Sequence, residues 1–174
     1  DLGYGMLEAG GSLVEAERLI EIAYEGLPDR ANVVDSLGWV RYHRGRLGDE
    51  INPDTGETID GAITLLRNAA ETLGADDDGT VNDHLGDAYY AAGRVDEAID
   101  AWRQAATRAN NAVSRLRASG RTGGVRFREI QGLATSAAMK RNAIQLGAEP
   151  GVEPQRGVLP EPSAGGSDPE TDEP

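Results

Sequence analysis

The side chains of this sequence that could act as general bases near neutral pH are its two histidines, His43 and His84. They stand far apart, and neither belongs to a Ser-His-Asp spacing; a nucleophile elbow and a dinucleotide-binding fingerprint are also absent from the sequence. The chain has no cysteine, which excludes disulfides, thiolate metal sites and a cysteine nucleophile. We therefore expect surface or packing roles for both histidines, no catalytic residues and no enzyme activity.

Two acidic stretches, 49–60 and 76–79, are the candidates for a calcium site. Neither reproduces the alternating Asp and Asn ligands, the central glycine and the later glutamate of a calcium-binding loop. The second stretch is explained better by its position, because its three aspartates precede a helix expected to begin near Thr80, and carboxylates favour the positive end of a helix dipole. We expect no metal and no cofactor.

The segment 121–128, Arg-Thr-Gly-Gly-Val-Arg-Phe-Arg, could surround a phosphate with backbone N–H groups and three guanidinium groups at the start of a helix. It lacks the G-x-x-x-x-G-K-[ST] pattern of a P-loop, and no predicted strand precedes it. A flexible connector between two helices explains the segment better.

The overall composition describes an acidic helical protein. Of 174 residues, 17 are Lys or Arg and 30 are Asp or Glu, giving a formal charge of −13. Positive charge is concentrated in 110–147, but the acidic remainder would repel a nucleic acid, so none is expected as a partner. With one Phe and two Trp, the core must be built from Ala, Leu, Ile and Val, which suits closely packed helices. The longest uncharged apolar run, 130–139, is too short and too polar to cross a bilayer.

Three segments of the chain share one spacing of small and large residues. Each begins with a Leu-Gly pair and has a second glycine eight positions after the leucine: Leu2-Gly3 with Gly10, Leu37-Gly38 with Gly45, and Leu85-Gly86 with Gly93. Each continues with a small, a large and a small residue at steps of four and three: Ala16, Ile20 and Ala23; Ala62, Leu66 and Ala69; Ala98, Trp102 and Ala105. Small residues let two antiparallel helices approach closely while the large ones interdigitate beside them. Each segment is therefore predicted to be a helix-turn-helix unit.

These positions, together with Gly-Arg-Leu at 45–47 and Gly-Arg-Val-Asp-Glu-Ala at 93–98, resemble the tetratricopeptide repeat (TPR), whose period is about 34 residues. The stretch 81–105 is a near-complete match. The resemblance implies an all-α, TPR-like helix-turn-helix solenoid over 1–118, whose units are listed here: a partial first unit at 1–28, a second at 30–74 and a third at 79–118. The second unit carries an insert, 48–59, whose Asn-Pro-Asp-Thr-Gly sequence predicts a turn and a small hairpin.

The end of the array is predicted from the hydrophobic pattern. The second helix of the third unit should continue past Asn110, because its apolar stripe runs on to Leu116. After the glycine-rich break at 119–124, an amphipathic segment at 125–147 stands where a capping helix would close the exposed core of a repeat stack. Residues 148–174, rich in Pro, Gly, Glu and Asp, are expected to form a disordered acidic tail. The sequence leaves open whether the basic capping segment attracts this tail or both remain solvated.

In repeats of this family the first helix of each unit lines a concave groove. The resemblance places on that face the residues Tyr4, Asn32, Asp35, Trp39, Tyr42, His43, Asp83, Asp87 and Tyr90. Family members that grip a partner's terminal carboxylate use Lys, Arg and Asn there, whereas the aspartates of this chain would repel an anionic end. The set suits an extended or helical peptide, or a partner surface, with apolar and basic side chains. The alternative is that Trp39 and Tyr42 pack between repeats and that the aspartates cap helices or keep the face hydrated.

The resemblance and the absence of a catalytic constellation predict a non-catalytic protein-protein interaction scaffold or adaptor. Two alternatives remain open: an accessory TPR region of an enzyme whose catalytic domain lies upstream, and a structural end of a longer array that mediates self-association. The Asp-Ser-Leu-Gly-Trp start of the second unit is similar to the C-terminal repeats of large bacterial multi-repeat proteins, some of them envelope adaptors. The chain is therefore expected to be a C-terminal fragment of such a protein, and both a cytoplasmic and an envelope location are compatible with it.

Overall fold

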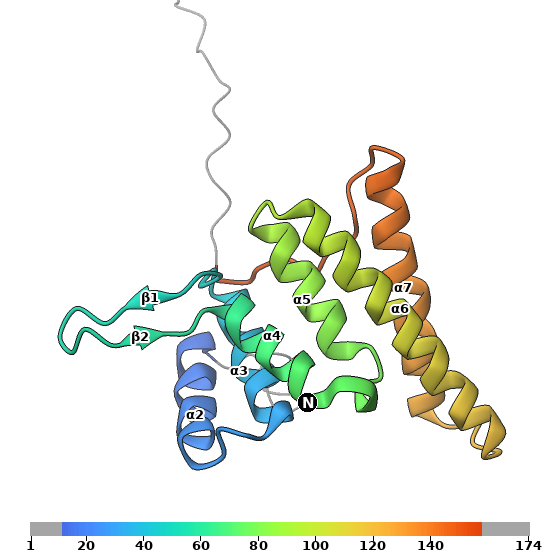
Figure 1. Ribbon diagram of the computed structural model, residues 1–174, viewed down its shortest axis with the longest axis horizontal. Helices are drawn as coiled ribbons and strands as arrows, with labels where there is room; N and C mark the ends of the chain where they lie inside the picture. The colour runs from blue at the N-terminus through green and yellow to red at the C-terminus, as the bar shows by residue number, and fades with distance from the viewer. Residues whose placement is uncertain (1–11, 158–174) are drawn as a thin grey trace, which may run out of the picture.

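The computed structural model describes residues 12–157, apart from the side chain of Ala75, and over this range the protein is all-α with one small β-hairpin (Figure 1). The α-helices of this range are α2 (Leu13–Gly26), α3 (Ala31–His43), α4 (Ala62–Leu73), α5 (Thr80–Ala91), α6 (Val95–Ala118) and α7 (Val125–Gln145). The other elements are the strands β1 (Glu50–Ile51) and β2 (Thr58–Ile59) and the 3-10 helix η1 (Gly74–Asp76). No helix within 12–157 is long and apolar enough to span a membrane.

Helices that follow one another in the sequence lie side by side in space. α3 pairs with α4 and α5 with α6, while α2 packs on α3, α4 on α5, and α7 along α6 (Figure 1). The turns that end α3 and α5 each use a glycine in the left-handed region, Gly45 and Gly93, with φ of 74° in both. The two pairs therefore repeat one local geometry, as the recurring glycines predict.

Two glycines mark points of close approach within the helix pairs. A Cβ atom at Gly38 would lie 2.8 Å from Cγ of Leu66, and one at Gly86 would overlap Cδ1 and Nε1 of Trp102. The predicted small residues of the facing helices are fully buried: Ala62, Ala69, Ala98 and Ala105. The small residues thus lie at the helix interfaces, and the side chains for which they make room are Leu66 and Trp102.

An ionic cluster helps to join α2 to α3. Glu17 of α2 is buried and accepts hydrogen bonds from Arg41 (2.9 Å), Arg46 (2.6 Å) and Arg44. Glu21 pairs with Arg41 at 2.6 Å. Burial opposes the charge of Glu17, but the hydrogen bonds from Arg44 and Arg41 hold the pKa of Glu17 below its usual value. The cluster fixes α2 beside the first helix pair.

The insert predicted at 48–59 forms an antiparallel hairpin that projects from the α3–α4 pair (Figure 1). The side chain of Asn52 shapes its turn by accepting the N–H of Asp54 at 2.9 Å. A Cβ atom at Gly61 would overlap the carbonyl oxygen of Gly48, so the two ends of the hairpin touch at its base. The insert therefore leaves α3 and α4 paired.

The last two helices form a long pair. α6 runs for 24 residues, past Asn110, which confirms the predicted extension, and α7 covers it over 21 residues. The cluster between them consists of Ala109, Ala112 and Val113 of α6 with Phe127, Ile130 and Ala134 of α7. α7 thereby buries one side of α6, as expected of a capping helix.

The first part of the predicted disordered tail is ordered. Residues 148–157 pack on the helices, because Pro150 is buried, Val152 contacts the core, and main-chain polar groups find partners on α3 and α5. The remainder of the predicted tail, 158–174, lies outside the described residues. So does the beginning of the predicted first unit, 1–11.

Candidate functional site

Residues 148–157, called the C-terminal strap below, cross the face formed by α5 and α3. The chain leaves α7 through Gly147, which has a φ of 70°. The N–H groups of Gly147 and Ala148 close the helix end on the carbonyls of Ile144 and Ala143. The strap then runs back toward α3, as the red end of the ribbon in Figure 1 shows. It thus covers the helices predicted to line a groove.

Main-chain polar groups hold the strap in place. The N–H of Glu153 donates to the carboxylate of Asp87 at 3.1 Å, and the carbonyl oxygen of Glu153 accepts from the hydroxyl of Tyr42. The N–H of Gly157 donates to the carbonyl of His43 at 2.7 Å. Because these partners come from both α3 and α5, they fix a non-helical chain in one register across the two helices.

Side chains of the strap add contacts at both of its ends. The hydroxyl of Tyr90 donates to the carboxylate of Glu149 at 2.7 Å, and the amide of Gln155 donates to the carbonyl of Tyr42 at 3.0 Å. Between them, a tight turn joins the N–H of Val152 to the carbonyl of Pro150 at 2.9 Å. The strap is therefore anchored on α5 at its start and on α3 at its end.

Lys140 of α7 forms ion pairs with two carboxylates predicted to face a partner. Its ammonium group lies 2.9 Å from Asp83 and 2.7 Å from Asp87, and Nε1 of Trp102 donates to Asp87 at 2.9 Å. Burial opposes the charge of Lys140, but the two carboxylates outweigh burial and raise the pKa of Lys140. Burial raises the pKa of Asp83. Both aspartates are therefore paired within the chain.

A stack of rings fills the space between α3 and α5. Trp39 lies between His84 and Tyr42, with ring centroids at 3.9 and 4.7 Å and planes within 14° of parallel. Nδ1 of His84 lies 2.8 Å from Asp35. Burial opposes a charge on His84, but the carboxylates of Asp35 and Asp83 outweigh burial and raise the pKa of His84. The imidazole is thereby held against Trp39 and paired with Asp35.

The structure brings most of the predicted groove residues together: Asp35, Trp39, Tyr42, His43, Asp83, Asp87 and Tyr90. Asn32 lies one turn before Asp35, at the exposed start of α3, and Tyr4 lies outside the described residues. Trp39, Tyr42 and His43 are at most 3% exposed. The face expected to be open is therefore closed at these residues, with the strap over Tyr42 and His43.

Sequence reasoning missed Lys140 and the strap. Lys140 is the single lysine of the chain, and it stands three residues after the buried Ala137 on the packed side of α7. A charged residue on the packed side of a helix indicates that a group of opposite charge lies buried beside it. The strap has no comparable signal, because its Pro, Gly and Glu content is also that of disordered segments.

His43 is buried beneath the strap, and within 12–157 neither of its ring nitrogens makes a well-aligned hydrogen bond. Burial and the charge of Arg156 outweigh the opposing effects of Glu153 and of the main chain at Pro154, and they lower the pKa of His43 to about 4. The imidazole is therefore neutral and packs edge-on against Trp39 and Tyr42.

Lowering the pH from 7 to 5 is expected to destabilise the fold through His43. The unfolded chain binds this proton near pH 6.5 and the folded chain near pH 4. In this window the unfolded state therefore holds more protons, and the free energy of unfolding falls by about 2 kcal/mol. Chemical denaturation at both pH values measures the loss.

The control for this effect is His43→Phe, which keeps a ring but binds no proton. Between pH 7 and 5, the free energy of unfolding of this variant should fall by about 2 kcal/mol less than that of the parent chain. The pKa of His84 is raised, so this residue stabilises the folded state as the pH falls. Because it is present in both proteins, its contribution cancels when their losses are compared. An equal loss in parent and variant would refute the role of His43.

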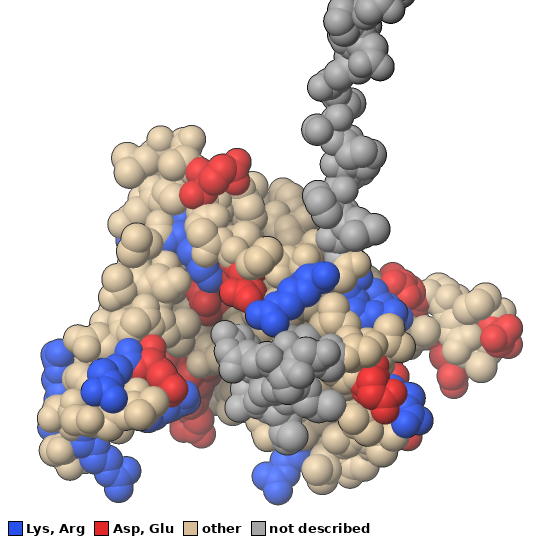
Figure 2. Space-filling view, turned by 180° about the vertical axis from the view of Figure 1, so that it is seen from behind, with Lys and Arg blue, Asp and Glu red and all other residues tan. Residues whose placement is uncertain are grey.

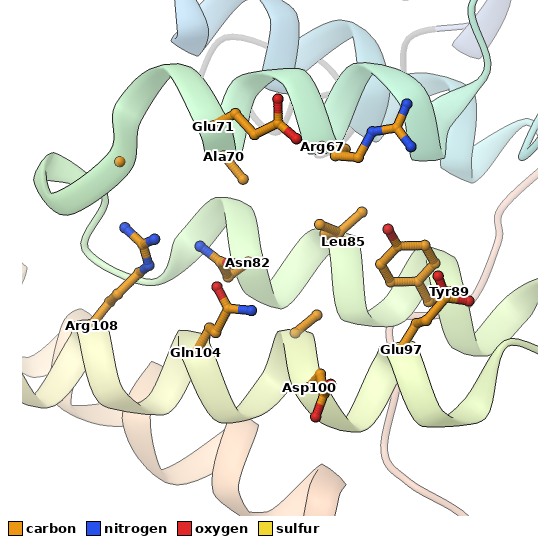
Figure 3. Close-up of a pocket in the computed structure, with 12 residues that line it drawn as sticks. Arg67, Ala70, Glu71, Asn82, Leu85, Tyr89, Glu97, Asp100, Gln104 and Arg108 are labelled. Atoms are coloured by element: carbon orange, nitrogen blue, oxygen red, sulfur yellow. The ribbon is translucent and has the colours of Figure 1, made fainter.

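An open cavity of about 510 Å³ lies on the other side of α5, between α4 and α6 (Figure 3). Its polar lining consists of Arg67, Glu71, Asn82, Tyr89, Glu97, Asp100, Gln104 and Arg108. Glu97 and Asp100 already pair with Arg94 and Arg103. The cavity offers charges of both signs but no nucleophile beside a base. Among residues 12–157, no group of three or more His, Asp or Glu is arranged to hold a metal ion.

Basic side chains gather at the end of the molecule where α6 meets α7 (Figure 2). Exposed members of this group are Arg115, Arg117, Arg121 and Arg128. They stand near the start of α7, whereas the strap leaves its other end, about 30 Å away along a helix of 21 residues. The basic end of the molecule therefore does not hold the described part of the tail.

No family model, curated protein or solved structure matches the chain. The strap and the face beneath it are therefore the features of the molecule that bear on its function.

Proposed function

We propose that this chain is a non-catalytic interaction module of the TPR type, a scaffold or adaptor that holds a non-helical segment of a partner protein across α3 and α5. The observation that carries the proposal is the strap itself, because the face accepts a polypeptide through hydrogen bonds to Tyr42, Asp87 and His43. The repeated helix pairs, with Gly38 and Gly86 at their close approaches, support the TPR-type arrangement.

The contacts suit a ligand of modest affinity. Each main-chain hydrogen bond contributes about 1 kcal/mol net, and the apolar anchors are Pro150 and Val152. A face that binds the backbone of its ligand and offers few side-chain pockets tolerates several sequences. Such tolerance is expected of an adaptor.

A second candidate is the structural end of a longer array. α7 buries one side of α6, whereas Val14 (59%) and Ile22 (56%) of α2 and Leu27 (49%) just after it are exposed. Apolar side chains at that end of the row of helices favour contact with a further helical segment.

Binding of a separate peptide tests the proposed function. The protein is the full chain carrying Val152→Asp, which weakens its own strap, and the probe is a synthetic peptide with the sequence of residues 148–157. We expect saturable shifts in amide NMR spectra, with a Kd on the order of millimolar. Adding Tyr42→Phe removes one hydrogen-bond donor and should weaken binding about tenfold.

The matched control is Tyr24→Phe, which makes the same substitution on α2, outside the strap contacts. It should leave the affinity unchanged. Absence of saturable shifts, or equal binding by the Tyr42→Phe and Tyr24→Phe proteins, would remove α3 and α5 as the binding face.

A further inference from the structure

We infer that the strap is an intramolecular competitor for the binding face, and that the partner is a non-helical segment recognised through its main chain rather than through charged side chains. This inference rests on the proposed function and adds to it the class of ligand and the way in which access is controlled. It is carried by three features of the strap: the groups it uses, the charges around it and the exclusivity of its contacts.

The main-chain contacts require a ligand that is not helical. Tyr42 donates to a carbonyl and Asp87 accepts an N–H of the same residue, Glu153, while His43 accepts the N–H of Gly157. In the interior of an α-helix these groups are already bonded to one another. Of the two ligand forms compatible with the sequence, extended or helical, the face therefore selects the extended one.

The charges around the face are paired within the chain. Lys140 already pairs with Asp83 and Asp87, and His84 pairs with Asp35, so these aspartates are not available to a partner's Lys or Arg. Among the charged side chains of the strap, Glu149 accepts from the neutral hydroxyl of Tyr90, and Glu153 pairs with Arg156 of the strap itself at 3.2 Å. The ligand is therefore held by main-chain contacts, and the basic side chains expected from sequence alone are not required.

The strap and a partner cannot occupy the face together. Tyr42 has one hydroxyl proton to donate, and the strap uses it. Because the strap is tethered at Gly147, its effective concentration at the face is on the order of millimolar, which lowers the apparent affinity of any separate ligand. Release of the strap must therefore precede or accompany partner binding.

A reversible disulfide tests this competition. The chain has no native cysteine, and a Cβ atom at Gly157 would lie 3.3 Å from Cα of Arg44. Arg44→Cys with Gly157→Cys should therefore form one disulfide that closes the strap when oxidised. Glu17 keeps Arg41 and Arg46 as partners in this variant, and circular dichroism checks that the fold is retained.

The probe is again the synthetic peptide of residues 148–157, added to the Arg44→Cys/Gly157→Cys chain that also carries Val152→Asp. We expect binding to the reduced protein and at least tenfold weaker binding to the oxidised one. Gly157→Cys alone, in the same Val152→Asp background, should bind equally in both redox states. A peptide with Gln in place of both glutamates keeps the main-chain contacts and should bind the reduced protein within about threefold of the original peptide.

The outcomes separate the two proposals. Equal binding to oxidised and reduced protein would overturn the competition while leaving the binding function standing. Much weaker binding of the Gln-substituted peptide would overturn recognition through the main chain. Binding in neither state, with the disulfide shown to open and close, would overturn the proposed function and this inference with it.

Discussion

Replacing Lys140 by methionine is expected to lower the free energy of unfolding by about 3–5 kcal/mol. The substitution removes the ammonium group that pairs with both Asp83 and Asp87, whose side chains are 14% and 1% exposed. Two carboxylates would then remain close together in a site with little water and without the ammonium group that pairs with both. Urea denaturation of the full chain at pH 7 measures the loss.

The mechanism is checked by removing the orphaned charges as well. Lys140→Met combined with Asp83→Asn and Asp87→Asn should recover most of the lost stability, because the buried negative charges are gone. Arg128→Met, on an exposed position of the same helix, should change stability by less than about 0.5 kcal/mol. A loss below about 1 kcal/mol for Lys140→Met would show that water or a rearranged side chain reaches the two aspartates.

Gly86→Ala is expected to cost about 3 kcal/mol, the second large effect. A Cβ atom at this position overlaps Cδ1 and Nε1 of Trp102. The indole is fully buried, and its Nε1 donates to Asp87 at 2.9 Å, so the ring cannot move aside without losing that bond. α5 and α6 must separate instead. The shift in denaturation midpoint measures the cost.

Substitutions at two other glycines serve as comparisons for Gly86→Ala. A Cβ atom at Gly38 meets the flexible side chain of Leu66 at 2.8 Å, so Gly38→Ala should cost about 1 kcal/mol. A Cβ atom at Gly132, inside α7, would meet no packed neighbour within 4 Å among the described residues, and Gly132→Ala should stabilise the chain by up to about 1 kcal/mol. If Gly86→Ala stabilised the chain, as is expected of Gly132→Ala, then α5 and α6 would not approach each other as closely as they do in the structure.

The helices were predictable from sequence because their determinants are local. Gly38 and Gly86, with the alanines four and three residues from Leu66 and Trp102, repeat at fixed intervals, and such periodicity places helix pairs without knowledge of distant contacts. The hairpin of the insert was predictable for the same reason, because the side chain of Asn52 shapes its turn through a hydrogen bond to a residue two positions away. Local chemistry was therefore sufficient for these elements.

The covering of the face formed by α3 and α5 was not predictable in the same way. Tyr42 and Asp87 were assigned to it by repeat position, but their partners are Glu153 and Lys140, which are far away in sequence. Nothing periodic connects these residues, and burial of a charged or hydroxyl group depends on where the whole chain folds back. Repeat positions identified the residues of the face, and only the tertiary contacts showed that it is occupied.

The hairpin between α3 and α4 has a practical consequence. Gly48 and Gly61 touch at its base, so the chain ends that flank it are held together whatever lies between them. Lengthening a loop whose ends are already adjacent costs only a fraction of a kcal/mol per doubling, about 0.6 kcal/mol. The tip around Asp54 is thus a natural place to graft a fluorescent tag or an affinity epitope without disturbing the rest of the molecule.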